Sequence, residues 1–278
     1  MKMIVTGAKG FIGSALVREL KARGVEVAEI DLGDKIEDLT GVWDVFYHLA
    51  WIGKAGPKRT DWRIQLGNVD MALKYFEEAK RLKVNRFICA GTIGEKMLEL
   101  PECAKLKSQN AIYVNSKRYL HHLLNAMSDE ECHVIWATLG NMYGCGAAGG
   151  SVIDYALQTI LKDEDAIFGP GTQPYDFTNV EVAIRGLAEI GLSMAIVRDE
   201  FYVGTGKPRL LKEWLVEVGA IAGKAERIRI GGRPDDGTRF KAEWFSIDNL
   251  TRETGYVPRI EFKDGIKANI EYLCNNLK

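Results

Sequence analysis

Tyr113 and Lys117 are the two residues whose types and spacing most directly suggest chemistry. They stand four residues apart at the start of a helical apolar pattern, and this separation places both side chains on one helix face. A free tyrosine has a pKa near 10, so proton transfer at neutral pH requires a shift of roughly 3 units, or about 4 kcal/mol. A neighbouring ammonium is one source of such a shift. The pair predicts acid/base chemistry at the phenol; the structural alternative is a core tyrosine beside a solvated lysine.

Thr92 adds a hydroxyl group to this pair. It follows the apolar run 86–90, which predicts a strand, so it is expected at the carboxyl edge of a sheet. There its hydroxyl would hydrogen-bond a substrate oxygen that also meets the Tyr113 phenol. We therefore expect Thr92, Tyr113 and Lys117 to converge on one crevice as catalytic residues.

Three glycines separate the short apolar strand 2–6 from a helical pattern that begins at Phe11. Gly7, Gly10 and Gly13 suit a tight turn, close backbone contact with a pyrophosphate, and a helix N-terminus that faces the phosphates. Their GxxGxxG spacing differs from the usual GxGxxG fingerprint, so the position between strand and helix carries the prediction. We expect this turn, with Phe11 and Ile12, to bind a dinucleotide.

Asp31 ends the next predicted strand, 25–30, where a carboxylate accepts hydrogen bonds from adenosine ribose hydroxyls. The alternative is an aspartate that lies on the surface beside an ordinary glycine turn. A carboxylate at this point repels the 2′-phosphate of NADP, which favours NAD, although Lys35 nearby leaves NADP open. The segment 31–44 is short for a full crossover helix and strand, which indicates a trimmed adenine side of the sheet.

Strand and helix patterns alternate along the first half of the chain. Further strands are expected at 44–49, 86–90 and 133–139, with helices around 66–76 and 114–124. Such alternation predicts an α/β fold with a doubly wound, mainly parallel Rossmann-type sheet. We expect a dinucleotide-binding domain at 1–167, rejoined by a strand near 201–206, and a smaller discontinuous C-terminal lobe within 168–278 that binds substrate. The ligand site is expected in the cleft between them.

The bulk composition is that of a globular protein, and it excludes several classes. Lys and Arg number 37 against 38 Asp and Glu, so no global field favours nucleic acid or an anionic membrane. The five scattered cysteines form no CxxC pair and have no histidine at metal-ligand spacing, which predicts reduced thiols and no metal site. With no signal peptide and no apolar run of about 20 residues, we expect a cytoplasmic protein.

The order of these motifs resembles the extended short-chain dehydrogenase/reductase superfamily, in particular its NAD-dependent epimerase/dehydratase family, whose members act on nucleotide sugars. The resemblance covers nearly the whole chain, and the segments that carry it are TGAKGFIG, DVFYHLA, the strand before Thr92, YVNSK, GNMYG, GPGTQPYDFTNV, FYVGTG and GGRPDDG. It implies Tyr113 as acid/base, Lys117 as the residue that lowers the Tyr113 pKa and holds the nicotinamide ribose, and Thr92 as ligand of a substrate oxygen. It also implies cofactor contacts at Leu49 and Ala50.

The resemblance further implies that Asn141 contacts the phosphate side of the substrate. Where the family usually has an arginine before the Asp-Phe pair, this chain has Tyr175, which puts the usual diphosphate clamp in doubt. Arg233 and Asp236 are expected to bind the nucleotide, with a solvated loop arginine as the alternative for Arg233. Trp51 stands where the family has a small residue, and it either narrows the pocket or packs.

The activity implied is hydride exchange at a sugar carbon, expected to be C4, by an NAD(P)-dependent nucleotide-sugar epimerase or 4-keto-sugar reductase. Elimination of water is disfavoured because Ile93 and Gly94 replace the Asp-Glu pair typical of dehydratases. The alternative class is a non-catalytic dinucleotide sensor on the same fold. The resemblance also implies a homodimer through helices near 66–82 and 112–127. His121 and His122 are expected on the surface or at that contact.

Overall fold

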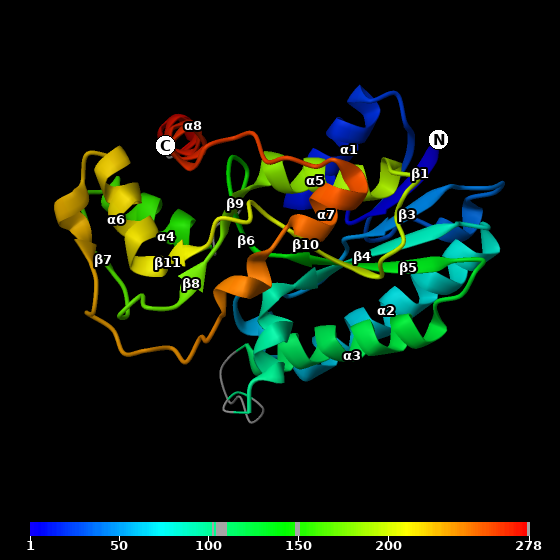
Figure 1. The fold of residues 1–278 in the computed structure, drawn as a ribbon, viewed down its shortest axis with the longest axis horizontal. Helices are drawn as coiled ribbons and strands as arrows, with labels where there is room; N and C mark the ends of the chain where they lie inside the picture. The colour runs from blue at the N-terminus through cyan, green and yellow to red at the C-terminus, as the bar shows by residue number, and fades with distance from the viewer. Residues whose placement is uncertain (102, 104–109, 148–150, 277–278) are drawn as a thin grey trace.

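A parallel sheet of six strands forms the centre of the molecule (Figure 1). The computed structural model describes residues 1–101, 103, 110–147 and 151–276. The strands of the sheet are β1 (Lys2–Thr6), β2 (Glu26–Ile30), β3 (Val45–His48), β4 (Arg86–Thr92), β5 (His133–Leu139) and β10 (Glu200–Val203). Their order is β10-β5-β4-β3-β1-β2, and every neighbouring pair is parallel. The predicted doubly wound Rossmann-type fold is confirmed.

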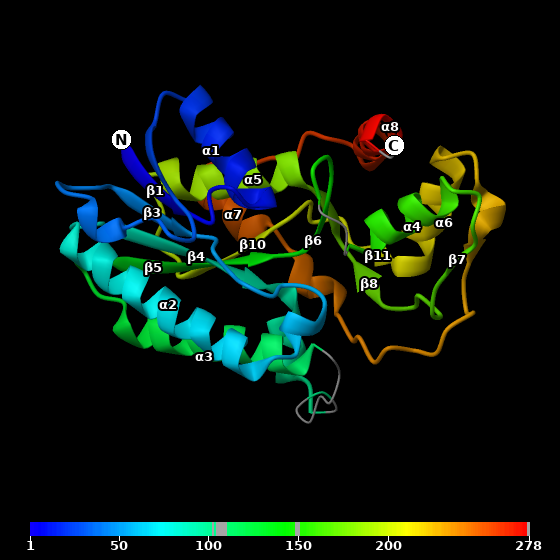
Figure 2. The same cartoon turned by 180° about the vertical axis from the view of Figure 1, so that it is seen from behind.

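Helices cover both faces of this sheet (Figures 1 and 2). On one face, α1 (Phe11–Ala22) and α5 (Val180–Leu192) pack side by side, with α7 (Asp248–Thr254) next to α5. On the other face, α2 (Trp62–Arg81) packs against α3 (Ala111–Met127). The buried apolar side chains accordingly divide into one cluster on each face. This two-sided cover explains why the central residues of the inner strands are mostly apolar.

The strand order reverses between β1 and β3, two parallel neighbours whose carboxyl ends lie side by side. β1 pairs with β2 on one side and with β3 on the other. Only the short 3₁₀ turn η1 (Ile36–Asp38) lies between β2 and β3, so β2 is the edge of the sheet. The predicted short connection between these strands is confirmed, while its place on the adenine side stays a prediction; a switch point of this kind is where open α/β sheets bind ligands.

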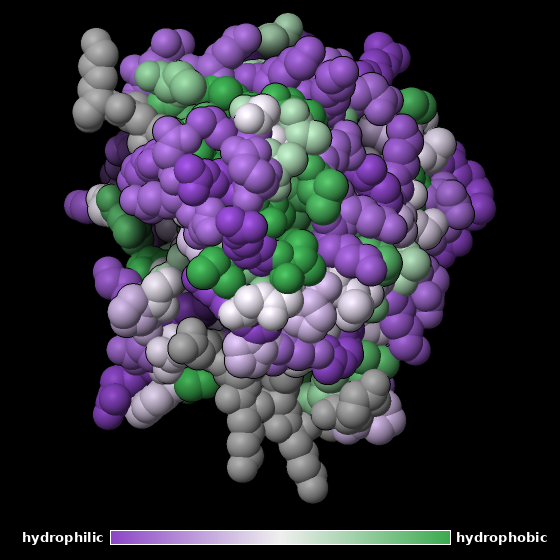
Figure 3. Space-filling model, turned by 90° about the vertical axis from the view of Figure 1, so that its left-hand side faces the viewer, coloured by the Kyte–Doolittle hydropathy of each residue, from purple (hydrophilic) through white to green (hydrophobic). Residues whose placement is uncertain are grey.

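A second group of elements forms a lobe beside the sheet. It contains α4 (Val152–Ile160), α6 (Leu211–Ile221) and α8 (Phe262–Asn276), with the strand pairs β7 (Ala166–Ile167) and β12 (Ile228–Arg229), β8 (Pro174–Tyr175) and β11 (Arg209–Leu210), and β6 (Asn141–Tyr143) and β9 (Phe177–Asn179). Their apolar side chains form a separate cluster. The face of the molecule at this end is largely hydrophilic, with a smaller hydrophobic group near its centre (Figure 3).

The predicted division of the chain at residue 167 stays a prediction. The packing of the helices does not divide at residue 167. Helix α4, which precedes this residue, packs within the lobe, whereas α5, which follows it, packs on the sheet. β10 joins the sheet beside β5, as expected for the strand near 201–206. Within the described residues, no helix combines the length and the apolar character needed to cross a membrane.

Candidate active site

The turn between β1 and α1 forms a cradle that only glycine fits. Gly7 has a φ of +69°, and a Cβ there would lie 2.9 Å from the Ala50 backbone nitrogen. A Cβ on Gly13 would lie 2.0 Å from the Gly7 carbonyl oxygen. The absence of side chains lets the first turn of α1 approach a ligand closely. The cavity beside this turn is lined by all the residues predicted for cofactor contact other than Lys117: Gly7, Gly10, Phe11, Ile12, Gly13, Asp31, Leu49 and Ala50.

Asp31 lies directly after β2 at one end of this cavity. Its carboxylate accepts hydrogen bonds from the backbone N–H groups of Lys9 at 2.7 Å and Leu32 at 2.8 Å. These bonds fix the side chain beside the glycine turn, with oxygen lone pairs left to accept bonds from ribose hydroxyls. The glycine cradle and this carboxylate therefore fit the adenosine and pyrophosphate parts of a dinucleotide.

A second cavity continues from the first toward the carboxyl ends of β4 and β5. The two share Phe11, Ile12, Leu49, Trp51 and Lys54 as lining residues, so they form one crevice. Thr92, Tyr113, Lys117 and Asn141 line its far part. The structure therefore brings the three predicted catalytic residues together, at the opposite end of the crevice from Asp31.

Thr92 and Tyr113 meet directly. Thr92 is the last residue of β4, and its hydroxyl is hydrogen-bonded to the Tyr113 phenol. Burial raises the pKa of Tyr113, the carboxylate of Glu95 raises it further, and both the Arg59 guanidinium and the Thr92 hydrogen bond lower it. The phenol is thus protonated at neutral pH in the ligand-free protein, ready to donate a proton; acting as a base requires additional positive charge.

Lys117 lies one helical turn beyond Tyr113, and its side chain is buried. Its ammonium donates a hydrogen bond to the Ala90 carbonyl oxygen at 2.7 Å and lies 3.7 Å from the centroid of the Trp51 ring. Burial lowers the pKa of Lys117. The cation is therefore held by one carbonyl and one aromatic face at the crevice wall, where it reaches any ligand that enters.

The residues predicted for substrate binding lie around two adjoining cavities, one between the sheet and the lobe and one within the lobe. Asn141 borders the catalytic crevice and also a neighbouring cavity that Tyr175 and Asp236 line. Tyr175, Asp236 and Arg233 line a further cavity, where the Arg233 guanidinium donates to the Tyr155 hydroxyl at 2.9 Å. Tyr175 is buried against the Phe177 and Phe240 rings, and burial raises its pKa to about 12. A neutral ring therefore occupies the position at which the resemblance implies an arginine.

Several groups at the site were not identified as functional from the sequence. Arg59, in the loop before α2, stacks on the Tyr113 ring. Trp51 both lines the crevice and packs against the apolar cluster beneath α2 and α3, so the structure bears out both alternatives for it. Glu95 is buried and accepts a hydrogen bond from the Thr92 backbone N–H at 2.8 Å. The T-x-x-E spacing of Thr92 and Glu95, typical of a capping box, was the available signal for Glu95.

The expectation that His121 lies on the surface or at a subunit contact is wrong. His121 is buried, stacks on the Trp136 ring with centroids 4.3 Å apart, and places Nδ1 3.4 Å from a Glu95 carboxylate oxygen. Its position four residues after Lys117 puts it on the same helix face, which the sheet covers. His122 is exposed, as expected.

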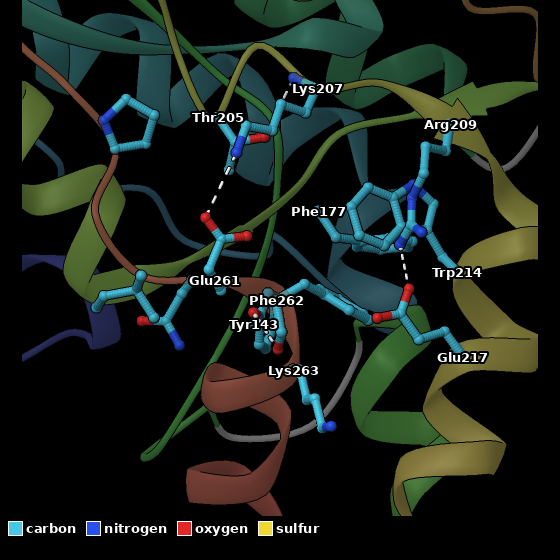
Figure 4. Close-up of a pocket in the computed structure, with 13 residues that line it drawn as sticks. Tyr143, Phe177, Thr205, Lys207, Arg209, Trp214, Glu217, Glu261, Phe262 and Lys263 are labelled. Atoms are coloured by element: carbon cyan, nitrogen blue, oxygen red, sulfur yellow. Dashed lines mark hydrogen bonds and ion pairs between the residues drawn. The ribbon is translucent and has the colours of Figure 1, made fainter.

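A separate cavity lies between β6, β9, α6 and the start of α8 (Figure 4). Four of its charged side chains form two ion pairs, Arg209 with Glu217 at 2.6 Å and Lys207 with Glu261 at 3.5 Å, and Lys263 also lines the cavity. The Arg209 guanidinium also stacks on Trp214. The paired charges are neutralised within the wall, and none of the residues that line this cavity lines the catalytic crevice, so we assign it no part in the chemistry.

Known proteins resemble this chain in both sequence and fold. Residues 3–190 match the model of the NAD dependent epimerase/dehydratase family. An uncharacterised UDP-glucose epimerase of Bacillus subtilis is 22% identical over 99% of this chain and 98% of its own length. A dTDP-4-dehydro-6-deoxy-D-allose reductase of Streptomyces bikiniensis is 31% identical over 46% of this chain and 34% of its own.

The fold is also found in solved structures of such enzymes. UDP-glucuronic acid 4-epimerase from Bacillus cereus, in complex with UDP-glucuronic acid and NAD, matches with a TM-score of 0.76 at 22% identity, over 99% of this chain and all of its own. The family match extends over most of the chain, including the glycine cradle and all three predicted catalytic residues. The predicted identity as an enzyme is confirmed, and the chain belongs to the NAD-dependent epimerase/dehydratase family.

Proposed function

We propose that this protein is an NAD-dependent nucleotide-sugar enzyme that transfers a hydride at C4 of the sugar, with Tyr113 as acid/base. The observation that carries the proposal is the single crevice that runs from the glycine cradle to Thr92, Tyr113 and Lys117. A dinucleotide in this crevice would lie along the first turn of α1, with its nicotinamide end toward the phenol. The relatives described above, whose names include epimerases and a reductase, support the same class of substrate.

The residues of the chain account for the proton side of the reaction. When bound, NAD would accept a hydride from the sugar carbon, and NADH would return one. Tyr113 would take the proton of the sugar hydroxyl as the carbon is oxidised and give it back on reduction, while Thr92 holds the same oxygen by a hydrogen bond. Lys117 would hold the nicotinamide ribose and favour the phenolate.

Epimerase and reductase both use this arrangement, and we favour the epimerase. The Bacillus subtilis relative matches along its entire length, whereas the reductase match covers less than half of this chain. Elimination of water is not proposed: Glu95, the nearest carboxylate after Thr92, accepts a bond from the Thr92 N–H and lies near His121. The alternative of a non-catalytic sensor is disfavoured by the contact between Thr92 and Tyr113.

We propose NAD in preference to NADP because the Asp31 carboxylate lies at the adenosine end of the crevice. The nucleotide-sugar end would lie near Asn141, Tyr175, Arg233 and Asp236, which border the adjoining cavities. A homodimer through α2 and α3 is supported by exposed hydrophobic side chains on these helices, namely Trp62, Leu66 and Tyr119. The cytoplasmic location stays a prediction.

The test is to identify the dinucleotide that the purified protein binds and to screen nucleotide sugars for cofactor absorbance change and C4 inversion together. With a substrate in hand, Tyr113→Phe should lower turnover by at least ~100-fold and leave NAD affinity largely unchanged, because only the proton donor is lost. Tyr272→Phe, an exposed tyrosine on α8, is the matched control and should keep full turnover. An unchanged rate in Tyr113→Phe would remove the phenol from the mechanism.

A further inference from the structure

The loop between β3 and α2 places a second cation against the proposed acid/base. Arg59 ends the 3₁₀ turn η2 (Pro57–Arg59), and its guanidinium carbon lies 3.9 Å from the centroid of the Tyr113 ring. Nε donates to the Asn110 side-chain oxygen at 2.7 Å, and Nη1 donates to the Lys54 carbonyl oxygen. Two hydrogen bonds and the contact with the phenol ring thus fix the orientation of the guanidinium.

Buried polar side chains of α2 hold this loop in place. Gln65 accepts a hydrogen bond from the Trp51 indole N–H at 2.8 Å and donates to the carbonyl oxygens of Gly53 and Lys58 at 3.1 and 3.0 Å. The Asn68 side chain pairs with both backbone groups of Ile52, each at 2.8 Å. Buried, fully paired networks of this kind fix a single loop conformation. Arg59 is therefore positioned before any ligand binds.

Trp51 contacts both Lys117, the other nearby cation, and the Tyr113 ring. Its ring presents a face to the Lys117 ammonium at 3.7 Å and packs edge-on against the Tyr113 ring, with centroids 6.0 Å apart. Arg59, by contrast, contacts the phenol ring directly. The charged groups that face Tyr113 or line its cavity are Arg59 from η2, Lys54 from the loop, Glu95 after β4, Lys117 from α3 and Asp154 from α4.

We propose that Arg59 is a positioning residue for Tyr113: its guanidinium stabilises the phenolate, the form that accepts the proton of the sugar hydroxyl and that forms again when this proton is returned. The proposal rests on the proposed function for its role in catalysis, but the electrostatic contact itself does not depend on a substrate. A cation over an aromatic face in surroundings of low polarity favours the anionic form of that ring more than it favours the neutral form. Arg59 thus offsets the cost of burying the phenolate next to the Glu95 carboxylate.

The test is a pH titration of Tyr113 in the NAD-bound protein, monitored by the near-UV absorbance of the phenolate. The signal of Tyr113 is obtained by subtracting, for each protein, the titration of the same protein with Tyr113→Phe. Arg59→Met should raise the pKa of Tyr113 by about one unit, a tenfold change in ionisation, and Arg59→Lys should restore most of the difference. Turnover of Arg59→Met should fall about tenfold at neutral pH and recover at alkaline pH, because its pH profile moves with the phenol.

The matched control is Arg63→Met, which removes an exposed arginine that stacks on Trp62 at 4.4 Å in the first turn of α2. It should leave the titration unchanged. If Arg59→Met fails to fold, Arg59→Gln, which keeps a polar contact for Asn110, must show the same shift. An identical Tyr113 titration with and without the arginine would overturn the proposal. A shifted titration in a protein that turns over no nucleotide sugar would instead keep the Arg59 assignment and overturn the proposed activity.

Discussion

The environment of individual side chains decides what each of them does at this site. Burial and Glu95 raise the pKa of Tyr113, while Thr92 and Arg59 lower it. Burial lowers the pKa of Lys117, whose ammonium depends on one carbonyl oxygen and one indole face. The charged form of each group is therefore less favoured than it is in water, and a bound dinucleotide would change this balance for both.

The choice of cofactor belongs to the residue scale, because the Asp31 carboxylate lies at the end of the crevice that we propose binds the adenosine. Asp31→Ala should raise the affinity for NADP relative to NAD by about tenfold, or about 1.4 kcal/mol, since it removes the charge that repels a 2′-phosphate. Titration of the purified variant with both dinucleotides measures the ratio. Glu29→Ala, an exposed carboxylate on the same strand, is the control, and an unchanged ratio in Asp31→Ala would contradict the assignment.

At the scale of elements, the site depends on the short connections that follow the parallel strands. The turn after β1 forms the glycine cradle, the segment after β2 carries Asp31, and the loop after β3 carries Trp51 and Arg59. The last of these has no regular structure apart from η2, so its shape depends on hydrogen bonds to the beginning of α2. Asp61 caps that helix by accepting from the Arg63 N–H at 2.9 Å, which fixes where the loop ends.

Gln65→Leu tests whether these bonds determine the loop. The change leaves the Trp51 indole N–H and two carbonyl oxygens without their partner, so the free energy of unfolding should fall by about 1–3 kcal/mol. Turnover should fall as well, because Arg59 and Trp51 lose their fixed positions. Denaturant unfolding and steady-state kinetics measure the two effects. Gln158→Leu, a half-buried glutamine on α4, should change stability by less than about 0.5 kcal/mol; equal losses in both variants would argue against the network.

At the scale of the whole molecule, buried polar groups connect the sheet to the lobe, and others lie in the sheet next to the site. The buried Asp176 carboxylate accepts hydrogen bonds from the Tyr202 hydroxyl at 3.0 Å and from the backbone N–H groups of Thr205 and Gly206 at 2.8 and 2.9 Å. It ties the segment before β9 to the chain that leaves β10. Under the crevice, His48 is buried at the end of β3, with Nδ1 3.0 Å from the Thr6 hydroxyl.

His48 should make the stability of the whole fold depend on pH. Burial, followed by the Lys117 charge, lowers the pKa of His48 from 6.5 to about 3. Below pH 6.5 the unfolded chain binds a proton at His48 that the folded protein does not bind. The free energy of unfolding therefore decreases as the pH is lowered from 6.5 to the folded pKa of about 3. The loss should approach about 1.4 kcal/mol per pH unit.

Denaturant unfolding of wild type and His48→Asn across this pH range measures the contribution. The asparagine keeps a polar group for Thr6 but does not titrate, so its stability should vary less steeply with pH. His122→Asn removes an exposed histidine and should retain the slope of the wild-type protein. Parallel curves for wild type and His48→Asn would show that His48 is not kept neutral by folding.

The sequence by itself determined the alternation of strands and helices along the chain, the glycine turn after β1, and the placement of Tyr113 and Lys117 on one face of α3. These features follow from local periodicity and from the backbone requirements of glycine, which a single chain segment expresses. The position of Asp31 after an edge strand was likewise readable from the short segment before β3.

Only the tertiary structure decided which groups surround the phenol. Arg59 and Tyr113 are far apart in the sequence, and the loop that brings them together has no periodic pattern; its shape comes from buried bonds to Gln65 and Asn68. The burial of His121 likewise depends on the face of α3 that packs on the sheet, next to Trp136. Contacts of this kind depend on how distant segments pack, which spacing along one segment does not encode.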